Sequence, residues 1–180
     1  MLGRKMEQAL NRQVNAELYS AYLYLSMCSY FKKINLNGCA RWMEIQSLEE
    51  LTHAMKFFNY VSERGEQVIL TPLEGPPIDW SSPLQVFENA YKHELEVTGL
   101  INNLVNMALE EKDHATNSFL QWFVVEQIEE EASANEVVQK LKLIRDNQSG
   151  LLMLDQELGR RAFTIPPGTT IVAGAGGGKG

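Results

Sequence analysis

Apolar residues recur every three or four positions along four long stretches of the chain, a spacing typical of helices that bury one face. In residues 4–33 this series contains no proline or glycine and consists of Leu10, Val14, Ala21, Cys28 and Phe31. The second stretch follows a short turn at residues 34–38 and ends near Arg64, before Gly65. A turn this short predicts that the first two helices are antiparallel neighbours.

The third and fourth helices have clear starting signals. Ser82 followed by Pro83 predicts an N-cap and a first helical residue, and this helix should extend to about Glu110. Asp113 is the predicted cap of the fourth helix. The predicted buried face of the third helix consists of Leu84, Phe87, Tyr91, Glu94, Thr98, Ile101, Val105 and Ala108.

After the fourth helix the pattern predicts only a short further element. Gly150 breaks the helical pattern, and the leucines between it and Gly159 predict a fifth helix. A helix this short needs something to dock on, which could be another subunit. From Pro166 onward proline, glycine and small residues dominate, so we expect residues 162–180 to be a flexible tail.

A long segment separates the second helix from the third. Residues 65–82 cannot continue a helix because they contain Pro72, Pro76 and Pro77. Extended at about 3.3 Å per residue, the segment could reach roughly 55 to 60 Å, whereas the second helix is only about 40 Å long. It can therefore cross the whole bundle before the third helix begins. We predict an all-α fold for residues 1–161, a four-helix bundle with a long crossover between helices 2 and 3 and a short fifth C-terminal helix.

Each long helix carries polar residues in the middle of its apolar face. They are Glu17 on the first helix, Glu50 and His53 on the second, Glu94 on the third, and Gln127 and Glu130 on the fourth. In the crossover arrangement these positions lie about 11 to 17 residues from the same end of the bundle, in a layer roughly 9 Å deep. We therefore expect the six side chains to converge.

Converging carboxylates are the typical ligands of a metal site. They repel one another and are costly to desolvate unless cations neutralise them. Oxygen ligands with one imidazole suit iron or manganese better than structural zinc or a calcium cage. The alternative is a polar network of protonated acids, and five ionisable groups on four helices argue against it.

Composition limits the other functions that the chain can have. Its 180 residues include 16 Lys and Arg against 23 Asp and Glu, for a net charge of -7 and a pI near 5.0. This balance lacks the basic field that nucleic acids or anionic membranes attract. No secretory signal pattern or membrane-length apolar run is present. We therefore expect a cytoplasmic protein with no nucleic-acid or membrane partner.

The cysteines and two of the histidines carry no predicted chemistry. Cys28 and Cys39 form no Cys-x-x-Cys pair and are too few for a disulfide framework. We expect them to be small buried apolar residues, although both lie near the same turn and a contact between them stays open. His93 and His114 have no partners on the predicted faces, so we expect both at the surface.

The sequence resembles the bacterial and archaeal non-haem ferritins over nearly all of residues 1–161. The segments that carry this resemblance are residues 15–24 (NAELYSAYLY), 49–54 (EELTHA) and 126–131 (EQIEEE). Ferritin-like di-iron bundles use one Glu from each of two helices and a Glu-x-x-His motif from each of the other two. Here Gln127-x-x-Glu130 replaces the second motif, which makes the two iron positions unequal.

The resemblance implies a role for each polar residue of the layer. The implied ferroxidase-centre ligands are Glu17, Glu50 and His53 at the first iron, and Glu50 as a bridge with Glu94 and Glu130 at the second. Gln127 would lie beside the oxygen-binding space, and Tyr24 would be an aromatic neighbour that can supply an electron. A third iron position would use Glu49, Glu126 and Glu129 and share Glu130. Two alternatives stay open: Glu126, Glu129 and Glu131 as a solvated acidic face, and Tyr24 as a plain core aromatic.

The implied function is iron storage. A ferritin oxidises Fe(II) to Fe(III) with O2 or peroxide and holds the ferric mineral inside a hollow cage, here expected to have twenty-four subunits with the fifth helix near a symmetry axis. We expect iron without haem, because Leu51 stands where bacterioferritins have a haem-binding methionine. A rubrerythrin-like peroxidase or oxidase is the alternative enzyme, but its Cys-x-x-Cys pairs are missing. A purely structural bundle is the non-enzyme alternative, and the intact ligand set argues against it.

Overall fold

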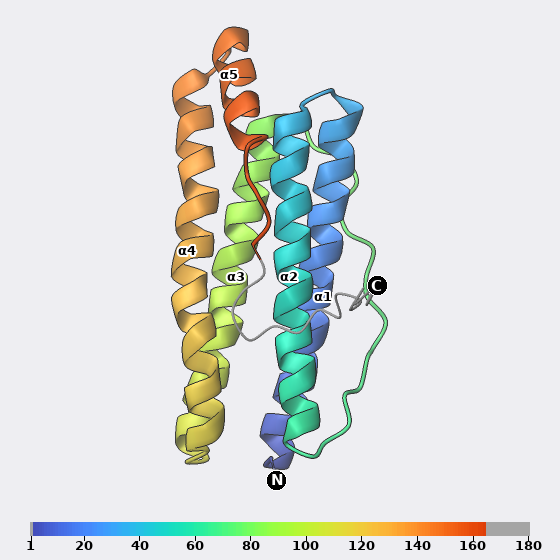
Figure 1. Ribbon diagram of the computed structural model, residues 1–180, viewed down its shortest axis with the longest axis vertical. Helices are drawn as coiled ribbons and strands as arrows, with labels where there is room; N and C mark the ends of the chain where they lie inside the picture. The colour runs from blue at the N-terminus through green and yellow to red at the C-terminus, as the bar shows by residue number, and fades with distance from the viewer. Residues whose placement is uncertain (1, 165–180) are drawn as a thin grey trace, which may run out of the picture.

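The computed structural model describes residues 2–164, which form five α-helices joined by turns and one long crossover. The helices are α1 (Arg4–Lys33), α2 (Asn37–Glu63), α3 (Pro83–Glu110), α4 (His114–Ile144) and α5 (Gln148–Leu158). In Figure 1 the first four helices run nearly parallel to the long axis, and α5 lies against one end. The predicted all-α four-helix bundle with a short fifth helix is confirmed.

The crossover follows the predicted path. Residues 64–82 leave the end of α2, run along the outside of α1 and reach the opposite end of the bundle, where α3 begins (Figure 1). Two side chains of α1 hold the segment: Asn11 Oδ1 accepts a hydrogen bond from the Ile69 amide at 2.7 Å, and Asn15 Oδ1 accepts one from the Thr71 amide at 3.0 Å. The order is therefore up, down, down, up, as the segment length allowed.

Both predicted helix starts are present. The Ser82 hydroxyl accepts a hydrogen bond from the Gln85 amide at 3.2 Å, with Pro83 at the first helical position. Asp113 caps α4 by accepting from the Thr116 amide at 3.1 Å. Each cap satisfies an amide that has no partner within its own helix.

The apolar core is divided into two halves. One half, at the α5 end, includes residues 23–31 of α1, while the other includes residues 6–14 of the same helix. α2, α3 and α4 change from one half to the other in the same way, at about residues 46–54, 94 and 127–130. The polar residues predicted to converge therefore occupy a layer between two apolar clusters.

The buried face of α3 is rotated from the prediction. Phe87, Glu94, Ile101 and Ala108 are buried as expected, but Leu84, Tyr91, Thr98 and Val105 are only half-buried. The fully buried positions between them are Val86, Ala90, Val97 and Leu104. From Tyr91 onward these buried positions lie one residue before the predicted ones. Helix α3 packs against both α1 and α4, and these contacts decide which positions are buried.

The prediction that Gly150 breaks the helical pattern was wrong. Gly150 lies in the first turn of α5, where its amide donates to the capping Asn147 side chain at 3.1 Å. The break comes earlier, at Arg145, whose φ of 51° is incompatible with a continuing helix. The sequence offered no glycine at that position to mark the turn.

Helix α5 docks on its own chain. Leu154 and Leu158 are buried against the bundle, and Asp155 Oδ1 accepts a hydrogen bond from the Cys39 amide at 2.8 Å. Asp155 thereby caps the start of α2, which has no cap of its own. Gly38 allows this close approach, because a Cβ there would meet the Asp155 carbonyl oxygen at 1.6 Å.

Cys28 and Cys39 are free and buried in the same apolar cluster. Their prediction as small buried apolar residues is confirmed. Among the helices of residues 2–164, none combines the length and the apolar character needed to span a bilayer.

Docking of α5 can be tested at Gly38. We expect Gly38→Ala to lower the free energy of unfolding by about 1–3 kcal/mol, because overpacking forces α5 or Asp155 to move. The amides of α5 should also exchange faster with solvent than in the parent protein, as measured by hydrogen–deuterium exchange.

Gly99→Ala is the matched control. A Cβ at Gly99 meets nothing within 4 Å, so alanine should be neutral or stabilise α3 by up to about 1 kcal/mol. Equal exchange of α5 in both variants would show that the close approach at Gly38 does not hold this helix in place.

Candidate metal centre

The middle layer of the bundle buries six polar side chains from four helices. No one of them is more than 5% exposed, and they are Glu17, Glu50, His53, Glu94, Gln127 and Glu130. All six were predicted to converge from their positions on the apolar faces. The structure places all of them in the layer between the two apolar clusters.

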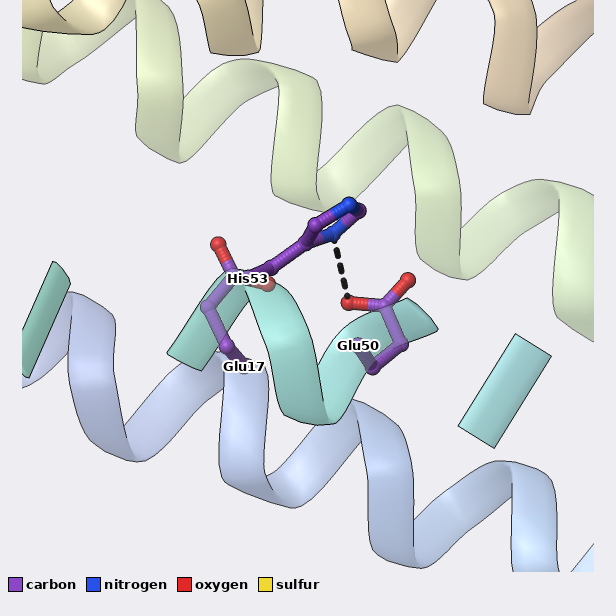
Figure 2. Close-up of side chains that lie close together, drawn as sticks. All are labelled: Glu17, Glu50 and His53. Carbon is purple, nitrogen blue, oxygen red and sulfur yellow. Dashed lines mark ion pairs between the residues drawn. The ribbon is translucent and has the colours of Figure 1, made fainter. Parts of the chain in front are cut away.

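Glu17, Glu50 and His53 form the first cluster. One ligand atom from each lies within 4.8 Å of the others, and His53 Nδ1 is 3.5 Å from Glu50 Oε2 (Figure 2). Glu50 and His53 come from the same face of α2 because they are three residues apart, and α1 brings Glu17 to them. These are the residues predicted for the first iron position.

His53, Glu126 and Glu130 form a second cluster with the same spacing limit of 4.8 Å. His53 Nε2 is 3.9 Å from Glu126 Oε1, so the imidazole lies between the two groups of carboxylates. Glu94, predicted as a ligand of the second position, belongs to neither cluster. Its carboxylate accepts hydrogen bonds from the Tyr24 hydroxyl and, at 3.3 Å, from Gln127 Nε2.

The donor atoms fit a metal cation. Among the described residues, Glu17 Oε2, Glu50 Oε2 and His53 Nε2 are buried without a hydrogen-bond partner. Buried lone pairs of this kind are costly to leave unsatisfied. Carboxylate oxygens with one imidazole nitrogen are the donor set that suits iron or manganese.

Comparisons with known proteins agree with this geometry. The model of the ferritin-like domain matches residues 7–144. The chain is 42% identical to a bacterial non-heme ferritin of Bacteroides fragilis over 161 residues, which cover 89% of this chain and 100% of that protein. The chain belongs to the ferritin family.

Solved structures of archaeal ferritins are also similar to the chain. The open pore ferritin of Archaeoglobus fulgidus is 57% identical, with a TM-score of 0.89 over 90% of this chain and 100% of that one. Its engineered closed form is likewise 57% identical, with a TM-score of 0.90 over 91% and 100% of the two chains. The ferritin-like fold is therefore shown by both sequence and structure.

Burial controls the protonation of this ferritin's carboxyl groups. Desolvation raises the pKa of Glu17 to about 7 and that of Glu94 to about 8, with the neighbouring carboxylate Glu130 adding to both shifts. The pKa of Glu50 is raised well above its usual value, first by burial and then by Glu94 and Glu17. Without a metal, much of this cluster therefore holds protons near neutral pH.

His53 shifts in the opposite direction. Burial, with a smaller contribution from Lys56, lowers the pKa of His53 to about 3. The imidazole is consequently neutral at physiological pH. Neutral imidazole has a free nitrogen lone pair, which is the form that binds metals.

Two glutamines that the sequence did not single out as site residues orient the ligands. Gln13 Nε2 donates to Glu17 Oε1 at 2.8 Å, and Gln46 Nε2 donates to Glu130 Oε2 at 2.7 Å. Both glutamines are buried, and each lies four residues before a predicted ligand on its own helix. This spacing is a signal that could have identified them, since it puts each glutamine one turn from a buried glutamate.

Tyr24 and Gln127 both contact the site through Glu94. Tyr24 is fully buried, and its hydroxyl donates a hydrogen bond to Glu94 Oε1. Gln127 Nε2 donates to both the carboxylate and the backbone carbonyl of Glu94 at 3.3 Å. Their predicted roles beside the oxygen-binding space and in electron supply stay predictions.

The outer acidic residues separate into different environments. Burial raises the pKa of Glu49 and of Glu126 to about 7, and both are only partly exposed. Glu129 is exposed, while Glu131 accepts a hydrogen bond from Thr98 at 2.6 Å. Glu49 also pairs with Arg161 at 2.6 Å, a partner that the sequence did not indicate.

The surface prediction for His93 was wrong, whereas His114 is exposed as expected. His93 is partly buried, with Nε2 2.7 Å from Ser20 Oγ and its ring edge-on to Tyr24 at 6.3 Å between centroids. The reason is the rotation of α3, because His93 lies one helical turn from the buried residues Ala90 and Val97 and so borders the face that they share.

The buried acids predict that the metal-free protein is less stable at high pH. Glu17 and Glu94 bind protons more tightly when folded, because their pKa values are raised from 4.5 to about 7 and about 8. Their stabilising contribution is complete below about pH 4.5 and is lost as the pH rises through these values. We expect the melting temperature in EDTA to fall by roughly 5 °C or more between pH 5 and pH 8.

Glu17→Gln isolates the contribution of one buried acid. Glutamine cannot ionise, so this variant should lose less stability than the parent between pH 5 and pH 8, whereas Glu110→Gln at an exposed position should behave as the parent. A parent melting temperature that stays constant or rises over this range would contradict the raised pKa values.

Proposed function

We propose that the chain is an iron-storage protein that oxidises Fe(II) to Fe(III) at the buried layer, with O2 or H2O2 as the oxidant. The observation that carries this proposal is the cluster of Glu17, Glu50 and His53, each of which has one buried oxygen or nitrogen atom without a hydrogen-bond partner. The names of the similar proteins support it. Iron is the substrate and the cargo, and no haem is required.

Iron binding would exchange protons for metal. The carboxylic acids of the layer must ionise before they bind Fe(II), so each cation entering the site displaces protons. The neutral His53 needs no such step and provides a nitrogen ligand to whichever cation lies between the two clusters. The residues predicted as ligands of the two iron positions are Glu17, Glu50, His53, Glu94 and Glu130.

Electron balance favours a pair of irons. Two Fe(II) ions supply the two electrons that reduce O2 to H2O2 with two protons, or H2O2 to water. The proposed second position, at Glu50, Glu94 and Glu130, includes no imidazole of its own in the predicted ligand set. Weaker binding there favours release of Fe(III) for storage over a retained cofactor.

A third iron position is proposed at the outer acids Glu49, Glu126 and Glu129, with Glu130 shared. Glu126 and Glu130 already form a cluster with His53, which supports this position. Glu129 is exposed and would have to turn toward the metal.

We propose that the chain works as a homo-oligomer, and specifically that twenty-four subunits form a cage that encloses the mineral. An apolar groove of about 440 Å³ on α1, α2 and the crossover supports assembly, since it leaves Tyr22, Leu25 and Leu51 each more than 40% exposed. The free buried thiols suit a reducing compartment such as the cytoplasm.

Replacement of Glu50 tests the proposed oxidation. We expect Glu50→Ala and the isosteric Glu50→Gln to reduce the initial rate of Fe(II) oxidation at least about a hundredfold, because a ligand shared by both irons is lost. The rate would be followed by stopped-flow absorbance of Fe(III) under air.

Exposed Glu110→Gln is the matched control and should oxidise iron at the parent rate. Size-exclusion chromatography of each variant would establish that assembly is unchanged. Parent-like oxidation in both Glu50 variants would refute the assignment of the centre to this layer.

A further inference from the structure

Arg161 follows the last helix in the sequence but lies against α2, beside the buried acidic layer. The chain after α5 turns back along the bundle beside α2 (Figure 1). Arg161 Nη2 lies 2.6 Å from Glu49 Oε2, and its Cζ lies 4.7 Å from the centre of the Trp42 ring. The guanidinium therefore reaches the edge of the buried acidic layer.

The surrounding structure holds Arg161 in this position. Helix α5 ends only a few residues before Arg161, and the contacts of Asp155 and Gly38 fix this helix on the start of α2. The Trp42 ring lies beneath the guanidinium and gives it a second contact on α2. The guanidinium of Arg161 thus contacts both Glu49 and Trp42. These two contacts distinguish the Arg161–Glu49 pair from a solvent-exposed ion pair, whose side chains are usually free to move.

The positive charge of Arg161 acts on more than its direct partner. It favours the ionised form of Glu49 and of Glu130, opposing the effect of burial on the pKa of each carboxyl group. Lys56 provides the corresponding charge for Glu126. Arg161 Nη1 is buried and has no hydrogen-bond partner, so the guanidinium retains an unused donor group.

We propose that Arg161 is a resident cation of the outer acidic site that competes with a metal ion for Glu49. This inference rests on the proposed function, since it concerns the third iron position. A metal bound by Glu49 must displace the guanidinium or lie close to its positive charge. Arg161 thereby keeps metal binding at the outer site weak, so that iron passes through it.

Calorimetric titration of the metal-free protein with Zn(II) at pH 8 tests this competition without any redox step. In Arg161→Gln we expect the outer Zn(II) to bind about tenfold more tightly, a typical size for the coupling between two sites. Arg161→Lys retains the charge and should stay near the parent affinity. The inner position at Glu17, Glu50 and His53 should be unchanged in both variants.

Two further variants separate competition from general effects. Arg160→Gln removes the same charge from the exposed neighbouring position and should leave all Zn(II) affinities unchanged. In a Glu49→Gln background, Arg161→Gln should change the outer affinity by less than about twofold, because the ligand that binds Arg161 is gone and only the charge effect on Glu130 remains. Hydrogen exchange of α5 would show whether each variant keeps its docking.

The outcomes are distinct from those that test iron oxidation. An outer Zn(II) affinity that is equal in Arg161→Gln and the parent, or a gain that stays near tenfold without Glu49, would overturn the proposal and leave Arg161 a packing residue. The Glu50 variants test the oxidation itself under air. Competition between Arg161 and Zn(II) does not depend on iron oxidation, and iron oxidation does not depend on this competition, so either proposal can fail alone.

Discussion

The burial of four carboxyl groups in one layer is the constraint on which the rest of the structure depends. Glu17, Glu50, Glu94 and Glu130 come from four different helices, and taking each as an ion into the interior would cost several kcal/mol. Burial raises the pKa values of these carboxyl groups, so they stay protonated and uncharged when no cation is bound, which avoids this cost. Bound cations and protons are therefore alternative ways of neutralising the same layer.

The apolar parts of the bundle serve this layer. Two separate apolar clusters, one on either side, hold the four helices at fixed register, and side-chain amides from Gln13 and Gln46 orient individual carboxylates. The crossover makes α3 start at the same end as α2, so their glutamates meet at one level. The docking of α5 places Arg161 against Glu49, at the outer edge of the buried acidic layer.

Sequence patterns predicted the bundle, its two capped helices and the convergence of Glu17, Glu50 and His53, because helical spacing determines which residues share a face. They failed where a single position decides the outcome. Helix α3 is rotated from the predicted orientation, which leaves His93 partly buried. The helix break at Arg145 has no glycine that would have indicated it. Arg161 could not be found, since its contact with Glu49 spans most of the chain and depends on how α5 docks.

The most direct test of proton and metal exchange is to count protons released as Fe(II) binds to the metal-free protein without oxygen, in weakly buffered solution at pH 6.5 and at pH 9. The account predicts saturable binding with between about one and two protons released per Fe(II) at pH 6.5, and far fewer at pH 9. Saturable binding with no proton release at pH 6.5 would contradict it, as would the absence of saturable binding.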